Sequence, residues 1–283
     1  MSEPKKSPAE LSAEQAVFWN GPGGEGWLAA YARIERAIAE LGQIVLSAAA
    51  AHAGEQVVDI GCGTGGTTAA LAKAVGPGGH VLGVDISEPL IAAARAQGLA
   101  NATFVVSDAT THRFEAASRD LVFSRFGVMF FGDAVAAFRN IHRALKPSGR
   151  MVFLAWRTAQ ENPWATVPVR AAQPFLPPQP RPPEDVGQFS FGDRTRVERI
   201  LGEAGFGPPR FEPVDQQIWM GDSTAEVVAG TGRFGPLARA FAGAEPAAIE
   251  KAKQAIAEVL APHERPDGVR LPGACWLVTA SAR

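Results

Sequence analysis

Residues 57–68 read VVDIGCGTGGTT, a short apolar run followed by four glycines among small polar residues. A β-branched run that ends at glycine is typical of a buried strand. A glycine-rich turn directly after such a strand is typical of a ligand-binding loop in an open α/β sheet. The question that this loop raises is which ligand it receives.

Strands and helices alternate after the loop. The expected strands are residues 56–60, 80–86, 102–108, 119–124 and 150–156. The expected helices between them are residues 67–75, 88–97 and 134–146. Strands separated by helices form a parallel sheet with both faces covered, so we predict an α/β, Rossmann-like fold.

The pattern is less regular after residue 156. Six prolines between residues 171 and 183 argue against regular structure there. A helix over residues 193–204 and two late strands, 210–220 and 274–282, are expected beyond it, with helical material over 224–260. We expect an N-terminal helical segment or cap over residues 1–50 and a main domain over 51–283, with cap insertions at about 157–191 and 222–268.

Composition and charge narrow the class of protein. A net charge of −2 and a pI of 6.2 provide no basic field for nucleic acid. Two cysteines make no disulfide framework and suit a reducing cytoplasm. The first residues lack the apolar core of a signal peptide, and no apolar run reaches the ~18 residues of a membrane span. Five histidines share no metal-ligand spacing, so we expect a soluble, cytoplasmic protein without a metal site.

The glycines of the loop fit the dinucleotide fingerprint. Gly61, Gly63 and Gly66 satisfy G-x-G-x-x-G, and Asp85 follows after about 20 residues, where a ribose-binding acid is expected. Taken alone, this pattern indicates an NAD(P)-binding oxidoreductase. That alternative stays open, although the sequence offers no candidate for a proton donor beside a nicotinamide.

Two further acids favour a different ligand. Asp59, two residues before the first glycine, would repel a pyrophosphate but attract an ammonium group. Asp108 follows the third expected strand, at the carboxyl edge where open α/β sheets bind ligands. Acids at three successive strand ends suit a ligand with a cation, a ribose diol and an amino-purine. That description fits S-adenosylmethionine.

Each candidate cofactor residue has an expected role. Asp59 orders the loop and receives the methionine ammonium, while Gly61 and Gly63 admit the carboxypropyl chain without a Cβ clash. Cys62 offers its backbone rather than a nucleophilic thiol.

The adenosine end has its own set of candidates. Asp85 accepts both ribose hydroxyls, and Ile86 packs on the adenine face. Asp108 accepts from the adenine amino group beside the backbone of Ala109, and Ser124 ends the fourth expected strand at the same edge.

These motifs together resemble a known family. VVDIGCGTGG, GVDIS, SDA, DLVFSRFGVMFF and ALKPSGRMVF are similar to the successive motifs of class I S-adenosylmethionine-dependent methyltransferases, over roughly residues 55–156. FWNGPGGEGW, NPW and GVRLPGACWLVTA resemble a bacterial branch related to the ubiquinone and menaquinone biosynthesis methyltransferases. The resemblance implies a seven-stranded, mostly parallel sheet whose last strand is antiparallel, with S-adenosylhomocysteine as the product.

Methyl transfer requires alignment more than acid–base chemistry, and no catalytic residue stands out. Arg125 could orient an anionic acceptor or close the site, and a structural salt bridge is an equally open interpretation. Five aromatic side chains are expected to converge above the cofactor: Trp19, Trp27, Phe130, Trp156 and Trp164. Aromatics at that place suit a flat, partly apolar acceptor or a π contact to the sulfonium, and some of them are expected to be core residues.

The sequence therefore predicts a methyltransferase for a small molecule, with O- or C-methylation of an aromatic or quinone-like acceptor. A non-catalytic S-adenosylmethionine-binding module is a second alternative. We also expect the insertions to form a mobile cap, with the glycine-rich residues 20–26 as a hinge before a helix over 31–41.

Overall fold

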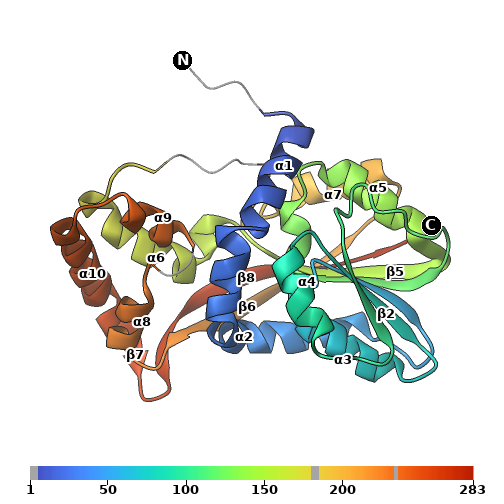
Figure 1. Ribbon diagram of the computed structural model, residues 1–283, viewed down its shortest axis with the longest axis horizontal. Coiled ribbons are helices and arrows are strands. Elements are labelled where there is room, and N and C mark those ends of the chain that lie inside the picture. The colour runs from blue at the N-terminus through green and yellow to red at the C-terminus, as the bar shows by residue number, and fades with distance from the viewer. Residues whose placement is uncertain (1–5, 180–184, 233–234, 283) are drawn as a thin grey trace.

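The structure, a computed structural model, describes residues 6–179, 185–232 and 235–282 (Figure 1). These residues form one eight-stranded sheet with the order β3-β2-β1-β4-β5-β8-β6, and β7 pairs with β8 at the edge. The strands are β1 (Gln56–Ile60), β2 (His80–Asp85), β3 (Ala102–Val106), β4 (Arg119–Arg125), β5 (Leu145–Trp156), β6 (Arg210–Gly221), β7 (Glu264–Arg265) and β8 (Gly268–Ser281). Strands β1 to β5 are parallel, and β8 runs antiparallel to both β5 and β6. The predicted α/β sheet is confirmed, with the two-residue β7 as an additional strand.

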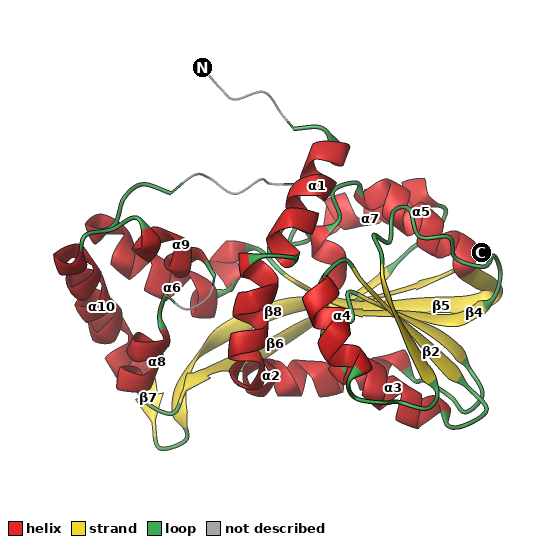
Figure 2. Ribbon diagram, viewed as in Figure 1, coloured by secondary structure: helices red, strands yellow, loops and turns green. Residues whose placement is uncertain are grey.

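Helices cover both faces of the sheet (Figure 2). They are α1 (Pro8–Trp19), α2 (Pro22–Ala49), α3 (Gly66–Val75), α4 (Glu88–Arg95), α5 (Ala134–Ala144), α6 (Pro163–Ala172), α7 (Arg194–Ala204), α8 (Thr224–Gly230), α9 (Pro236–Ala242) and α10 (Pro246–Leu260). Short 3₁₀ turns are Gly127–Phe130, Ala159–Glu161, Gln173–Phe175 and Ala261–His263. Because the strands of the middle of the sheet are covered on both sides, β1 is buried from Val57 to Ile60.

A second, smaller core lies beyond the end of the main one. Helices α6, α8 and α10 gather at the left of the molecule around the outer end of β8 (Figure 1). Its buried side chains are Ala172, Val227, Ala252, Ile256, Leu260, Val269 and Leu271. The segments that we predicted as two separate insertions therefore pack against each other and share one apolar core.

Most of the glycine-rich residues 20–26, which we expected to act as a hinge, are helical, and their mobility stays a prediction. Helix α2 begins at Pro22 and continues without interruption to Ala49. A Cβ on Gly24 would lie 2.2 Å from the carbonyl oxygen of Trp19, so glycine permits close packing of α1 against α2 at this point. The expected helix over 31–41 is confirmed as part of α2, whose buried Leu41 and Val45 belong to the main core.

The start of the fifth strand also differs from the sequence prediction. Strand β5 begins at Leu145, so Pro147 and Gly149 lie within the strand rather than between a helix and a strand. A break in register between Arg119 and Leu121 of β4 accommodates this early start. The proline-rich stretch contains the end of α6 and one 3₁₀ turn, and its Pro180, Pro182 and Pro183 lie outside the described residues.

Candidate functional site

The glycine loop connects β1 to α3 at the carboxyl edge of the sheet. The amides of Gly61 and Cys62 both donate to the carbonyl of Val84, at 2.8 and 3.2 Å. Gly61 has φ +66°, and a Cβ there would lie 2.6 Å from the Cα of Gly127. Glycine at position 61 is therefore required by packing against the turn after β4, whatever the loop binds.

Gly63 faces open space instead. Its φ is +54°, and no atom of the described residues lies within 4 Å of the position that a Cβ would take. Its amide donates to Oδ2 of Asp85 at 2.8 Å. Gly63 is thus the loop glycine where a ligand could approach the backbone.

The backbone of Cys62, which we expected to face the cofactor, is hydrogen-bonded within the protein. Its amide bonds Val84, and its carbonyl accepts from the amide of Gly65 at 2.9 Å. The thiol is buried, and burial raises the pKa of Cys62 well above its usual value. The buried thiol and its raised pKa agree with the expectation that Cys62 is no nucleophile, and its backbone contact with a cofactor stays a prediction.

Asp59 is fully buried beneath the loop. Its Oδ2 accepts from the hydroxyls of Thr67 and Thr68, each at 2.7 Å, so Asp59 does order the first turn of α3. Its Oδ1 accepts no hydrogen bond from any described residue. Burial raises the pKa of Asp59 to about 6, although the two threonines and the charge of Arg125 oppose the shift. An unpaired buried carboxylate oxygen beneath the loop fits a nearby cationic group of a ligand.

Asp85 ends β2 next to the loop. Besides the amide of Gly63, its carboxylate accepts from the amide of Ser87 at 2.9 Å. Burial raises the pKa of Asp85. Each carboxylate oxygen can accept a second hydrogen bond, so the position remains compatible with a ribose diol. Ile86 follows in the turn to α4.

The other predicted cofactor residues have contacts within the protein. Asp108 lies two residues beyond the end of β3, and its Oδ1 accepts from the amide of Thr110 at 2.7 Å. Ala109 is buried, and its carbonyl accepts from Asn140. Ser124 donates to the carbonyl of Ile60 at 2.8 Å and is buried, which is a structural role at the end of β1.

Helix α2 brings two side chains to the loop that we did not select from the sequence. A Cβ on Gly66 would lie 3.1 Å from the hydroxyl of Tyr31 and 3.8 Å from Oε2 of Glu35. No local pattern marks these residues, because the contact joins positions about 35 residues apart. The first turn of α3 therefore contacts Asp59 on one side and helix α2 on another.

Arg125, at the end of β4, pairs with Glu35. Its Nη1 donates to Oε2 at 3.0 Å, and its Nη2 contacts Oε1. The two side chains are 12% and 27% exposed. Of the interpretations that we left open, the salt bridge is the one observed, and it attaches α2 to the sheet.

The five predicted aromatic residues fall into two groups. Trp19 contacts Trp27 and Phe130, with ring centroids 6.1 and 5.2 Å away. Trp156 contacts Trp164 and stacks on Phe126, with the latter rings 4.5 Å apart and nearly parallel. Trp156 is buried in the main core, so it is not part of an open pocket wall.

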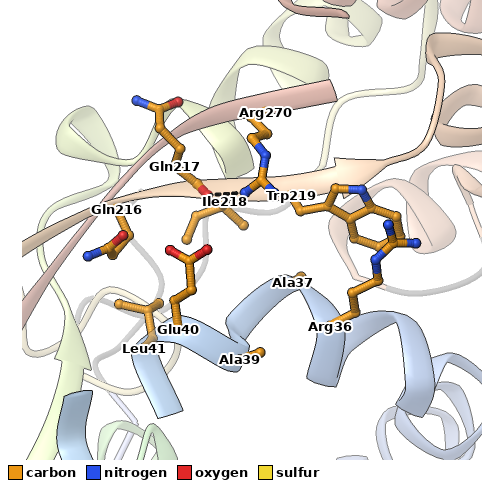
Figure 3. Close-up of a pocket in the computed structure, with 10 residues that line it drawn as sticks. All are labelled: Arg36, Ala37, Ala39, Glu40, Leu41, Gln216, Gln217, Ile218, Trp219 and Arg270. Carbon is orange, nitrogen blue, oxygen red and sulfur yellow. Dashed lines mark hydrogen bonds between the residues drawn. The ribbon is translucent and has the colours of Figure 1, made fainter. Parts of the chain in front are cut away.

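A small hollow of about 80 Å³ lies between α2 and β6 (Figure 3). The Arg36 guanidinium lies 3.8 Å from the centroid of the Trp219 ring and pairs with Asp222. We therefore interpret the hollow as a gap in the packing of α2 against β6.

Among the described residues, no cluster of three or more His, Cys, Asp or Glu side chains could hold a metal ion. Within the same residues, no helix is both long and apolar enough to cross a membrane.

Residues 57–149 match the family model described as a methyltransferase domain. The chain is 39% identical over 132 residues to the aklanonic acid methyltransferase DauC of Streptomyces sp. (strain C5), covering 44% of this chain and 54% of that protein. It is 30% identical over 166 residues to the nocamycin O-methyltransferase of Saccharothrix syringae, covering 54% and 59%. It is 39% identical over 103 residues to the demethylmenaquinone methyltransferase of Staphylococcus aureus (strain JH9), covering 36% and 43%. The chain spans about half the length of the curated relatives it matches.

Solved structures share the fold at low identity. The YcgJ protein of Bacillus subtilis aligns with a TM-score of 0.55 and 18% identity, over 86% of this chain and 97% of that chain. The phosphoethanolamine N-methyltransferase 2 of Haemonchus contortus, solved with S-adenosyl-L-methionine, aligns with a TM-score of 0.53 and 20% identity, over 86% and 53%. The predicted resemblance to methyltransferases is confirmed for residues 57–149, and the predicted fold for the sheet and its helices.

Proposed function

We propose that this chain, whose residues 57–149 match a methyltransferase domain, transfers a methyl group from S-adenosylmethionine to a small molecule. One arrangement carries the proposal. Acids at the ends of β1, β2 and β3 surround a loop in which Gly63 is open and Asp59 Oδ1 is unpaired among the described residues. A cation, a diol and an amino-purine would each meet an acid there.

The fit of the cofactor follows from these residues. When bound, S-adenosylmethionine supplies a methyl group already activated on a sulfonium. Asp59 would help to receive the ammonium end, directly or through water, Gly63 would admit the carboxypropyl chain, and Asp85 would hold the ribose hydroxyls. Asp108 and Ile86 would hold the adenine. The protein would then mainly align the acceptor and exclude water.

We propose an aromatic or quinone-like acceptor that is methylated on oxygen or carbon. Trp19, Trp27 and Phe130 form an aromatic cluster at the N-terminal end of α2, which suits a flat acceptor. Three relatives support this class of acceptor by their names: an aklanonic acid methyltransferase, a nocamycin O-methyltransferase and a demethylmenaquinone methyltransferase. Because Arg125 is already paired with Glu35, we give it a role in closing the site rather than in binding an anion.

We propose that residues 1–50 form a cap and that residues 51–283 form the methyltransferase domain. The insertions at about 157–191 and 222–268 contribute α6, α8 and α10, which share one apolar core. We place the protein in the cytoplasm, because Cys62 and Cys275 are both free and buried. No nucleic acid is proposed as a partner, because the net charge is −2.

Two measurements test the proposal. Calorimetry with S-adenosylhomocysteine and with NADH should show binding of the first and not of the second. Labelled S-adenosylmethionine should then be tried with phenols, quinols, amines and thiols, and we expect label in a phenol or quinol. Binding of NADH alone would favour the oxidoreductase alternative. Binding of S-adenosylhomocysteine without turnover on any acceptor would favour a non-catalytic module.

A further inference from the structure

The segment that joins α1 to α2, residues 19–24, is attached to the turn between β2 and α4, and we call it the N-terminal elbow. Asn20 makes most of this attachment. Its Oδ1 accepts from the amide of Glu88 at 2.9 Å, and its Nδ2 donates to the carbonyl of Ile86 at 3.0 Å. The hydroxyl of Ser87 donates to the carbonyl of Trp19 at 2.7 Å. The side-chain amide of Asn20 thus donates one hydrogen bond to the backbone of the turn and accepts one from it.

The same turn is connected to the glycine loop. The amide of Ser87 donates to Asp85, and Asp85 also accepts from the amide of Gly63. A continuous set of hydrogen bonds therefore runs from the elbow through the turn and Asp85 to the loop. A shift of the elbow would move the carboxylate that we assign to the ribose.

The N-terminal elbow also contributes Trp19 to the aromatic cluster. Trp19 carries the ring that contacts Trp27 and Phe130, and it is the residue directly before Asn20. Helix α2 packs closely on the backbone of Trp19, because a Cβ on Gly24 would lie 2.2 Å from the carbonyl oxygen of Trp19. Two adjacent residues therefore face the proposed cofactor turn and the proposed acceptor wall.

We infer that Asn20 is a positioning residue, which holds the Asp85–Ser87 turn in the geometry that binds the cofactor and transmits that geometry to Trp19. The inference rests on the proposed function. It predicts that cofactor binding orders the elbow and, with it, the aromatic wall, so that cofactor precedes acceptor. The alternative is that Asn20 only ends α1, since its Nδ2 also donates to the carbonyl of Ala16 at 2.8 Å.

Two variants of the full chain test these roles; both also lose the Nδ2 bond to Ala16, so the roles are separated by ligand affinity and hydrogen exchange rather than by stability. Asn20→Ala removes both bonds to the turn. Asn20→Asp keeps the shape and the acceptor for Glu88 but places a carboxylate oxygen against the carbonyl of Ile86. Asn20→Ala should weaken S-adenosylhomocysteine binding about 10-fold, the scale of two lost neutral hydrogen bonds. Asn20→Asp should weaken it to a similar extent, because one bond is lost and two oxygens are brought into contact. Asp193→Ala, which removes an exposed capping side chain from the N-terminus of α7, is the control for loss of a helix cap and should leave binding unchanged.

Hydrogen exchange with and without S-adenosylhomocysteine reads out the coupling. In the wild type, ligand should slow exchange both at residues 61–68 and at residues 16–28. In Asn20→Ala the slowing at 61–68 should remain at saturating ligand, while that at 16–28 is lost. A variant that melts lower but keeps wild-type affinity and protection would make Asn20 a helix cap only and overturn the inference. A wild type that does not bind S-adenosylhomocysteine would instead overturn the proposed function on which the inference rests.

Discussion

The amide of Gly63 donates a 2.8 Å hydrogen bond to Oδ2 of Asp85, which joins the loop after β1 to the turn after β2. The residue proposed to hold the ribose therefore also shapes the loop proposed to admit the methionine chain. The two ends of the binding site are not independent. Substitutions at either residue should be interpreted with this connection in view.

Asp85→Ala should weaken S-adenosylhomocysteine binding by about 2–3 kcal/mol, the scale of lost charge-assisted hydrogen bonds. It also removes the acceptor of the Gly63 and Ser87 amides, so the midpoint of thermal unfolding should fall modestly. Asp85→Asn keeps one acceptor oxygen and should lose less of both. Calorimetry on folded variants measures the affinities, and an unchanged affinity in Asp85→Ala would remove Asp85 from the cofactor site.

Gly63→Ala should impair binding far more than it impairs folding. A methyl group there meets no described atom within 4 Å, so the cost to the fold is only that of positive φ, about 1 kcal/mol. Gly54→Ala is the matched control, because Gly54 has φ +87° and equally open surroundings in the turn before β1. Both variants should melt at similar temperatures, and only Gly63→Ala should lose S-adenosylhomocysteine binding. Equal affinity in the two would mean that the loop faces no ligand.

The sequence predicted the middle of this molecule well, because strand, glycine turn and helix follow one another within a few residues there. Val57 to Ile60 are β-branched or acidic and end at a glycine, so the local pattern was sufficient. Contacts between distant segments left no such pattern. The need for glycine at Gly61 comes from Gly127, and the partner of Arg125 comes from α2.

The titration of Asp59 should make the stability of the fold depend on pH. Its pKa is raised from 3.8 to about 6 by burial, so between about pH 4 and 6 the folded state holds a proton that the unfolded state releases. Stability from this group is therefore present at low pH and lost as pH rises, by about 3 kcal/mol in total. Chemical denaturation of wild type and Asp59→Asn from pH 4 to 8 should show this slope only in the wild type.

The same group should make ligand binding depend on pH in the opposite sense. An ammonium group beside Asp59 favours the ionised carboxylate, so S-adenosylhomocysteine should bind more tightly as pH rises through about 6. Asp267→Asn, at an exposed acid paired with Arg270, should change neither profile. Parallel stability curves for wild type and Asp59→Asn would show that Asp59 is ionised throughout the range.

Glu35→Gln should destabilise the fold by about 2 kcal/mol. It leaves the guanidinium of Arg125, only 12% exposed, without its carboxylate. The value is below that of a fully buried pair because Glu35 is 27% exposed and partly screened. The double variant Glu35→Gln with Arg125→Gln should recover part of the loss, whereas Glu203→Gln in the exposed pair with Arg199 should cost at most a few tenths of a kcal/mol. Urea denaturation of the cycle measures the coupling, and strictly additive losses would contradict it.

Trp19→Ala and Trp156→Ala should fail in different ways, although both residues were first grouped as one acceptor wall. Trp156 is buried in the main core and stacks on Phe126, so its truncation should cost about 4 kcal/mol of stability.

The backbone carbonyl of Trp19 accepts a hydrogen bond from Ser87, and alanine retains that carbonyl. Truncation of Trp19 should therefore leave S-adenosylhomocysteine affinity within about threefold. Loss of its ring from the cluster with Trp27 and Phe130 should instead raise KM for the acceptor about 10-fold or more, with a smaller change in kcat. Steady-state kinetics with the acceptor found by the labelled screen measures the two constants separately. An unchanged acceptor KM in a folded Trp19→Ala variant would place the acceptor away from the N-terminal elbow.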